Sequence, residues 1–210
     1  MKNLYIAGAG GCGRELMGML ADSVKIRGSR WNIKGFLDDT NPDIGEMARQ
    51  YPIVGTIADF WPQPDDVVML GIAKPAAKEK VVTLLKARGV VFETFIHPYA
   101  ALGNFNSIGE GVVIYGGFGM TVNVKIGNFV TLQSCYLGHD VVVEDFATIS
   151  SFSNLMGHVR IGRKAFLGSS VAVPPQINVG EEAFVCVGSM LARDVTPGAR
   201  VMGNPAREIG

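Results

Sequence analysis

The sequence has no excess of charge of either sign, because its 210 residues include 19 basic and 19 acidic side chains. A balanced chain gives no indication of nucleic acid or an anionic membrane as a partner. Long hydrophobic runs are also missing: the longest, such as 67–73, are far too short to span a bilayer, and no basic, hydrophobic signal peptide opens the chain. We therefore expect a cytoplasmic protein without membrane insertion.

Cysteine is scarce, with only Cys12, Cys135 and Cys186, and no two of them form a CxxC pair. An odd number without that spacing fits free thiols in a reducing cytosol and not a disulfide framework. No disulfide is therefore expected to hold the fold together.

From position 108 onward the sequence repeats with a period of six, which no helix or ordinary sheet has. A hexapeptide parallel β-helix does, because each short side of a triangular coil places one aliphatic side chain inward. Three such positions per coil make about five coils. The aliphatic positions slip once by one residue, between Leu132 and Leu137; they are Ile108, Ile114, Met120, Ile126, Leu132, Leu137, Val143, Ile149, Leu155, Ile161, Leu167, Val173, Val179, Val185 and Leu191.

The amino-terminal part has a different pattern, in which a glycine-rich turn, 8–13, lies between a predicted strand at 3–7 and a helical segment at 14–21. This is GxGxxG in the context the motif requires: the glycines permit close backbone approach, and the helix amino end attracts phosphate. Further strands are expected at 33–37, 67–72 and 90–96, and a helix at 76–88. About 95 residues supply only one βαβαβ half, which fits a mononucleotide better than NAD. The alternative is that the glycines merely form a tightly packed turn.

His97-Pro98 marks the expected junction, since a residue before proline favours extended geometry. The predicted fold is an α/β Rossmann-like half domain at 1–98 followed by an all-β left-handed parallel β-helix at 99–198. A tail at 199–210 is expected to fold over the last coil and cap its edge. His97 lies outside the repeat and is interpreted as a linker residue.

His139 follows the slip in the repeat, and its neighbour Asp140 could orient an imidazole. With about eighteen residues per coil, His139 stacks over Gly157 and Asp140 over His158, about 4.8 Å away. Gly157 would then leave room for a ligand beside His139. His158 is either a solvated residue of the ladder or a partner of Asp140, and both readings remain open.

The repeat and the amino-terminal motif together resemble the NeuD/PglD-type sugar acetyltransferases of bacterial glycan pathways. The resemblance implies acetyl transfer from acetyl-CoA to an amine or hydroxyl of a sugar, often a UDP-linked amino sugar. It also implies a homotrimer with the site between neighbouring β-helices. A face with apolar side chains would then need a partner to cover it; its members are Phe118, Tyr136, Phe146 and Phe152. The residues that carry the resemblance are Gly8-Ala-Gly-Gly-Cys-Gly13, Phe36-Leu-Asp-Asp39, Ile96-His-Pro98, Gly138-His-Asp140, Glu144-Asp-Phe146, Gly157-His-Val-Arg-Ile-Gly162 and Gly203-Asn-Pro-Ala-Arg207.

Carried over residue by residue, the resemblance makes His139 the general base and Asp140 the acid that orients it. Acetyl-CoA contacts fall on four residues: Thr148, Gly157, Gly168 and Ser169. Contacts to the nucleotide sugar fall on seven: Gly8, Gly10, Gly11, Cys12, Gly13, Asp38 and Asp39. The reaction requires no metal, because acetyl-CoA is already activated and an amide N–H can hold the developing oxyanion.

The sequence departs from the family pattern at two positions. Thr148 stands where many relatives have a second histidine, and Cys12 stands where the glycine-rich turn commonly has one. Threonine donates a hydrogen bond but cannot carry a positive charge. The acceptor sugar and the acylated atom, nitrogen or oxygen, are therefore not fixed by the sequence.

Parts of the sequence pattern also suggest three other functions. A metal site like that of γ-type carbonic anhydrases needs three converging histidines, and the predicted β-helix has two. An NAD-dependent oxidoreductase would leave the β-helix without a role. A non-catalytic nucleotide-sugar-binding protein on the same scaffold remains the alternative to the enzyme.

Overall fold

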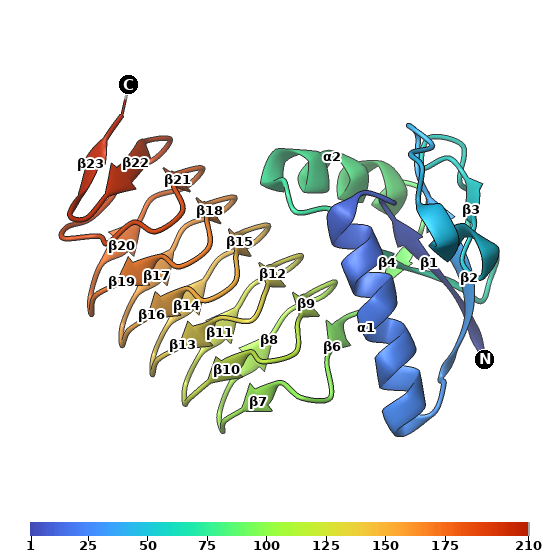
Figure 1. The fold of residues 1–210 in the computed structure, drawn as a ribbon, viewed down its shortest axis with the longest axis horizontal. Helices are drawn as coiled ribbons and strands as arrows, with labels where there is room; N and C mark the ends of the chain where they lie inside the picture. Colours follow the sequence, from blue (N-terminus) through green and yellow to red (C-terminus); the bar gives the residue numbers. More distant parts are fainter. Residues whose placement is uncertain (210) are drawn as a thin grey trace. The chain divides into compact units, whose positions relative to one another are not determined.

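The computed structural model describes residues 1–209 (Figure 1). Gly210, the last residue of the expected capping tail, lies outside the described residues. The chain divides into two compact units, Met1–Pro98 and the part that begins at Tyr99. Among residues 1–209, none of the helices combines the length and the hydropathy needed to cross a membrane.

The first unit is a parallel five-stranded sheet with two helices, and its strand order is β3-β2-β1-β4-β5. The order reverses at β1, so the carboxyl ends of β1, β2 and β4 border a crevice of the kind that binds ligands in open α/β sheets. The expected strand at 90–96 is instead two short strands. The elements are β1 (Lys2–Ala7), α1 (Gly11–Arg27), β2 (Trp31–Leu37), the 3₁₀ helix η1 (Gly45–Arg49), β3 (Ile53–Gly55), β4 (Asp66–Leu70), α2 (Pro75–Lys86), β5 (Val91–Phe92) and β6 (Phe95–Ile96).

Helix α1 begins in the glycine-rich turn and is longer than the predicted segment 14–21. It ends where Gly28 takes a left-handed φ of 78° and donates its N–H to the Val24 carbonyl at 2.8 Å. Glycine adopts that conformation without a steric penalty, which makes it the usual residue after a helix.

The second unit is the left-handed parallel β-helix that the repeat predicts (Figure 1). Fifteen two-residue strands, β7 to β21, stack coil upon coil into three parallel sheets. The inward aliphatic residues form its core; Leu132, Leu137 and Leu155, for example, are fully buried. The strands are β7 (Ala101–Leu102), β8 (Ser107–Ile108), β9 (Val113–Ile114), β10 (Gly119–Met120), β11 (Lys125–Ile126), β12 (Thr131–Leu132), β13 (Tyr136–Leu137), β14 (Val142–Val143), β15 (Thr148–Ile149), β16 (Asn154–Leu155), β17 (Arg160–Ile161), β18 (Phe166–Leu167), β19 (Ala172–Val173), β20 (Asn178–Val179) and β21 (Phe184–Val185).

The segment after the last coil continues one of the sheets. Strand β22 (Arg200–Gly203) pairs in parallel with β21, and β23 (Ala206–Glu208) returns antiparallel to β22. The amide of Ala206 also donates to the Met190 carbonyl at 2.8 Å. This short hairpin occupies the end of the sheet.

The corners between the strands share one backbone conformation. The third residue after most inward aliphatic positions has a positive φ of 56° to 73°, whether it is glycine, asparagine, phenylalanine or lysine. The corner between β12 and β13 has no such residue and is one residue shorter, so Met120 pairs with Leu137 and Leu137 with Leu155. The interruption therefore lies one corner before His139, and the corner that holds His139 is regular, which corrects the expectation that its backbone is irregular.

Two glycines of α1 allow opposite predictions within one helix. A Cβ added to Gly13 would lie 1.8 Å from the Gly8 carbonyl oxygen, whereas one added to Gly18 would meet nothing within 4 Å. We expect Gly13→Ala to destabilise the first unit by about 2–3 kcal/mol, since backbone must move. Gly18→Ala should stabilise it by about 0.5–1 kcal/mol, because alanine loses less entropy in a helix. Native-state hydrogen exchange of the β1 amides measures both; equal effects would contradict the assigned packing.

Candidate functional site

The most distinctive polar pair of the β-helix lies at the corner between β13 and β14. His139 Nδ1 donates a hydrogen bond to Asp140 Oδ2 at 2.8 Å. Because a carboxylate only accepts, this bond places the imidazole proton on Nδ1 and leaves the lone pair on Nε2. The His139 side chain is 56% exposed, so a ligand can reach its ring. The pair has the arrangement of a general base with an orienting acid.

The second oxygen of Asp140 is held from the coil before it. Asn123 donates from Nδ2 to Asp140 Oδ1 at 3.2 Å. The pKa of Asp140 lies below its usual value. The hydrogen bond from His139 is the largest cause, and the hydrogen bond from Asn123 is the next. Asn123 was not among the expected site residues, although it lies seventeen residues before Asp140, which is the length of one shortened coil.

Gly157 and His158 lie where the eighteen-residue spacing predicts. A Cβ on Gly157 would come within 2.5 Å of His139 Cε1 and Nε2, so the imidazole rests directly against the Gly157 backbone. The space that was expected to receive a ligand is thus filled by the ring itself. His158 Nε2 is 3.8 Å from Asp140 Oδ2, and the two imidazole rings are 5.0 Å apart at 86°.

The other three residues expected to contact acetyl-CoA do not join this corner. Thr148 lies in β15 and is fully buried, so its side chain offers no surface to a ligand. Gly168 and Ser169 lie at the corner between β18 and β19, which is a different edge of the β-helix. The two edges are separated by one side of the triangular coil, roughly five residues or about 16 Å at strand rise.

In the first unit, a hollow of about 360 Å³ lies at the glycine-rich turn. Gly10 and Gly11 are exposed in it, and an added Cβ at either would meet nothing within 4 Å. Gly13 does not line the hollow, because it packs against the Gly8 carbonyl. Six of the seven expected nucleotide-sugar residues line it, together with Lys74: Gly8, Gly10, Gly11, Cys12, Asp38 and Asp39.

The Asp38 carboxylate is occupied mainly by hydrogen bonds that stabilise the backbone around this turn. Its Oδ2 accepts the Ala9 N–H at 2.7 Å, and its Oδ1 accepts both the N–H and the hydroxyl of Thr40 at 2.8 and 2.7 Å. Burial alone would raise the pKa of Asp38, but these hydrogen bonds outweigh it and lower the pKa. Asp39 is exposed and accepts the Ala58 N–H through Oδ1 at 2.9 Å. Of the two carboxylates, Asp39 is the more available to a ligand. Lys74, which sequence reasoning missed, adds a positive charge just before α2.

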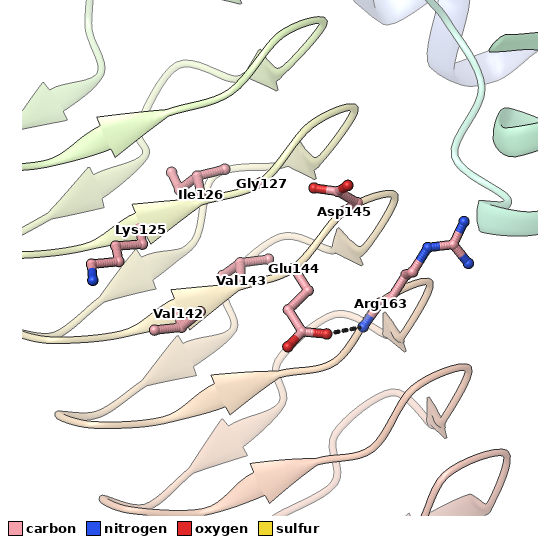
Figure 2. Close-up of a pocket in the computed structure, with 8 residues that line it drawn as sticks. All are labelled: Lys125, Ile126, Gly127, Val142, Val143, Glu144, Asp145 and Arg163. Atoms are coloured by element: carbon pink, nitrogen blue, oxygen red, sulfur yellow. Dashed lines mark hydrogen bonds between the residues drawn. The ribbon is translucent and has the colours of Figure 1, made fainter. Parts of the chain in front are cut away.

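A further hollow of about 370 Å³ lies on the sheet face that begins directly after Asp140 (Figure 2). Strands β11 and β14 form its floor, and the Glu144 carboxylate accepts the Arg163 backbone N–H at 2.9 Å. None of the residues expected to form the site lines it. Its residues are Lys125, Ile126, Gly127, Val142, Val143, Glu144, Asp145 and Arg163.

Comparison with known proteins agrees with this architecture. The family model of the PglD N-terminal domain matches residues 3–85. The structure of WeeI from Acinetobacter baumannii AYE is 27% identical, covers 100% of both chains and superposes with a TM-score of 0.88. Residues 3–85 belong to the PglD N-terminal domain family, and the whole chain resembles the NeuD/PglD-type sugar acetyltransferases. The resemblance carried by the glycine-rich turn and the repeat is thereby confirmed.

Two further solved structures share the fold at lower identity. The acetyltransferase domain of PglB from Neisseria gonorrhoeae FA1090, in complex with acetyl coenzyme A, is 24% identical, covers 99% of both chains and has a TM-score of 0.87. A mutant of perosamine N-acetyltransferase from Caulobacter crescentus, in complex with CoA and GDP-perosamine, is 21% identical, with 100% and 98% coverage and a TM-score of 0.88.

Curated relatives match shorter stretches of the sequence. Serine acetyltransferase 2 of Arabidopsis thaliana is 31% identical over 121 residues, which is 57% of this chain and 33% of that protein. An acyl-[acyl-carrier-protein]–UDP-N-acetylglucosamine O-acyltransferase of Stutzerimonas stutzeri (strain A1501) is 31% identical over 110 residues, 50% of this chain and 42% of that protein. The chain thus spans less than half the length of these curated relatives.

The hydrogen bonds to Asp140 give a direct pH prediction. We expect Asn123→Ala to raise the pKa of Asp140, and His139→Ala to raise it further, because His139 makes the larger contribution. Gln176→Ala changes the same corner position one coil beyond His158 and should leave that pKa unchanged. NMR titration of the Asp140 carboxyl carbon measures all three variants. Because the pKa of Asp140 is lower in the folded protein than in the unfolded chain, its hydrogen bonds contribute their full stabilisation above the unfolded pKa. This stabilisation is lost as pH falls through the folded pKa. An Asp140 pKa that is the same in wild type and His139→Ala would contradict the hydrogen bond assigned between the two side chains.

Proposed function

We propose that this protein is an acetyl-CoA-dependent acetyltransferase that acylates an amino or hydroxyl group of a nucleotide-linked sugar. The acceptor class we propose is a UDP-linked amino sugar of bacterial surface-glycan biosynthesis, in the cytoplasm. The observation that carries the proposal is the hydrogen bond of 2.8 Å that fixes His139 against Asp140 at an exposed corner of the β-helix. Support comes from the relatives whose structures hold acetyl coenzyme A, or CoA with GDP-perosamine.

In the proposed mechanism His139 Nε2 accepts the proton of the sugar amine or hydroxyl as that group attacks the thioester carbonyl. Asp140 stabilises the imidazolium that forms, because its carboxylate already accepts the Nδ1 proton. His139 then returns the proton to the departing thiol, so the base is regenerated. Asn123 keeps Asp140 in place through its other oxygen. General base catalysis of this kind contributes about 10²- to 10⁴-fold in rate.

The nucleotide sugar is proposed to bind in the hollow at the glycine-rich turn. Gly10 and Gly11 carry no packing constraint, so their place beside the amino end of α1 fits close approach to a phosphate. Lys74 adds charge complementarity there, and Asp39 offers an acceptor for ribose or base hydroxyls. Gly8 and Gly13 are both closely packed, which supports the tight-turn alternative for Gly13, whereas Gly8 also lines the hollow. Cys12 lines the hollow and is proposed to face the sugar.

The active sites are proposed to lie between subunits of a homotrimer. Gly157 and the pair Gly168–Ser169 occupy different edges of one β-helix, which is consistent with a site in which acetyl-CoA lies between two copies. Tyr136 and Phe152, 49% and 77% exposed, offer apolar surface for such contacts. Phe118, which was expected on this face, is buried and takes no part, while Phe146 is half-buried.

The first functional test is thiol release from acetyl-CoA with UDP-, CMP- and GDP-linked amino sugars. His139→Ala should lower turnover by about 10²- to 10⁴-fold, because it removes the general base, while acetyl-CoA binding measured by calorimetry is retained. Gln176→Ala, at the same edge but beyond His158, serves as the matched control. Equal rates in wild type and His139→Ala, or no turnover with any sugar, would favour the non-catalytic nucleotide-sugar-binding protein.

Subunit mixing tests the shared site. His139→Ala and Ser169→Tyr each should abolish activity alone, because each spoils every interface of its own trimer. Refolded together in equal amounts, they should recover about a quarter of wild-type turnover, since each mixed trimer keeps one intact interface. Failure to recover any activity, with mixed trimers verified by mass spectrometry, would place His139 and Ser169 in separate sites.

A further inference from the structure

Three potential ligand side chains converge at the His139 corner. Ligand atoms of His139, Asp140 and His158 all lie within 4.8 Å of one another. Oδ2 of Asp140 stands between the two imidazoles, 2.8 Å from His139 Nδ1 and 3.8 Å from His158 Nε2. The side chains are partly exposed, which leaves an open side toward solvent.

We propose that these three residues form a binding site for a divalent transition metal of the Zn²⁺ class, and that the bound metal inhibits acetyl transfer. Two imidazoles and one carboxylate are a donor set that zinc accepts, with a fourth position left to water. Bonds of about 2.0–2.2 Å in a tetrahedron separate the ligand atoms by about 3.4 Å. The observed separations of 2.8 and 3.8 Å from Asp140 lie on either side of that value, and the two imidazole ligand atoms lie within 4.8 Å of each other, so modest side-chain shifts bring all three within range of one ion.

The scaffold holds the three side chains in this arrangement. The His158 backbone N–H donates to the His139 carbonyl at 3.0 Å, which fixes the two coils against each other. Asp140 and His158 occupy the same corner position on neighbouring coils, with φ of 59° and 61°. Asn123 binds Oδ1 of Asp140 and so leaves Oδ2 directed at the imidazoles. The backbone therefore brings the three residues together, and Asn123 orients the carboxylate between the two imidazoles.

The metal and the catalytic pair both use His139 Nδ1, and inhibition follows from this shared atom. This step rests on the proposed function. A metal bound through His139 Nδ1 replaces the proton that Asp140 accepts, and the neutral imidazole then carries its proton on Nε2. Nε2 can no longer accept a proton from the sugar. His158 adds the third ligand without belonging to the base–acid pair, so a change at His158 separates metal binding from the presence of the base.

The direct test is zinc binding by chelator-stripped protein in competition with a chromophoric chelator. Wild type should bind one Zn²⁺ per chain, and His158→Asn should bind it at least about tenfold more weakly, having lost a ligand. Gln176→Ala, which changes the same edge one coil further, should bind as wild type does. Cobalt(II) spectra should lack a thiolate charge-transfer band, which excludes ligation by Cys12 or Cys186, both partly exposed. Equal zinc affinity in wild type and His158→Asn would overturn the site.

An activity arm distinguishes this inference from the proposed function. The turnover of each protein is divided by its own turnover in excess chelator. On this scale zinc should inhibit wild type strongly and His158→Asn much less. Zinc binding that depends on His158, in a protein that turns over no sugar, would uphold the metal site and reject the acetyltransferase. Turnover that zinc leaves unchanged at saturating occupancy would uphold the enzyme and reject inhibition at this site.

Discussion

The β-helix depends on the backbone hydrogen bonds that join each coil to the next in a fixed register. Leu137 pairs with Leu155 and Leu155 with Val173, so one aliphatic side chain from each short side always enters the core. The corners between the sides must turn sharply, and residues such as Phe129 and Lys164 take positive φ values there. That conformation costs about 1 kcal/mol or more for a residue with a side chain. The continuous ladder and the buried core offset this cost at every coil.

The same register assembles the candidate site without any long loop. Asn123, Asp140 and His158 occupy one corner position on three successive coils, and the His139 ring lies on Gly157. Each side chain is therefore placed by paired backbone on both sides. A general base held in this way needs little rearrangement to meet its substrate, which is the structural basis of preorganisation.

The glycine-rich turn of the first unit divides its glycines between two tasks. Gly8 and Gly13 are required because backbone atoms approach too closely for a Cβ, whereas Gly10 and Gly11 face an open hollow. Asp38 ties the turn to the end of β2 through one hydrogen bond from Ala9, and two hydrogen bonds from Thr40 hold its carboxylate in place. A single motif thus combines the packing role and the ligand-binding role that the sequence presented as alternatives.

The periodic features of the fold could be predicted from the sequence. A period of six sends aliphatic side chains inward only in a β-helix, and GxGxxG between a strand and a helix specifies the first turn, so both units were predictable. The spacing of eighteen also placed Gly157 beside His139. The tertiary structure alone decided what periodicity does not contain: that the His139 ring fills the space over Gly157, that Thr148 is buried and that Asp38 is occupied by Ala9 and Thr40. It also showed that the corner holding His139 is regular and that His158 approaches Asp140. Period and spacing assign a residue to a side and a level of the coil, but side-chain rotamers and neighbouring packing determine which atoms meet.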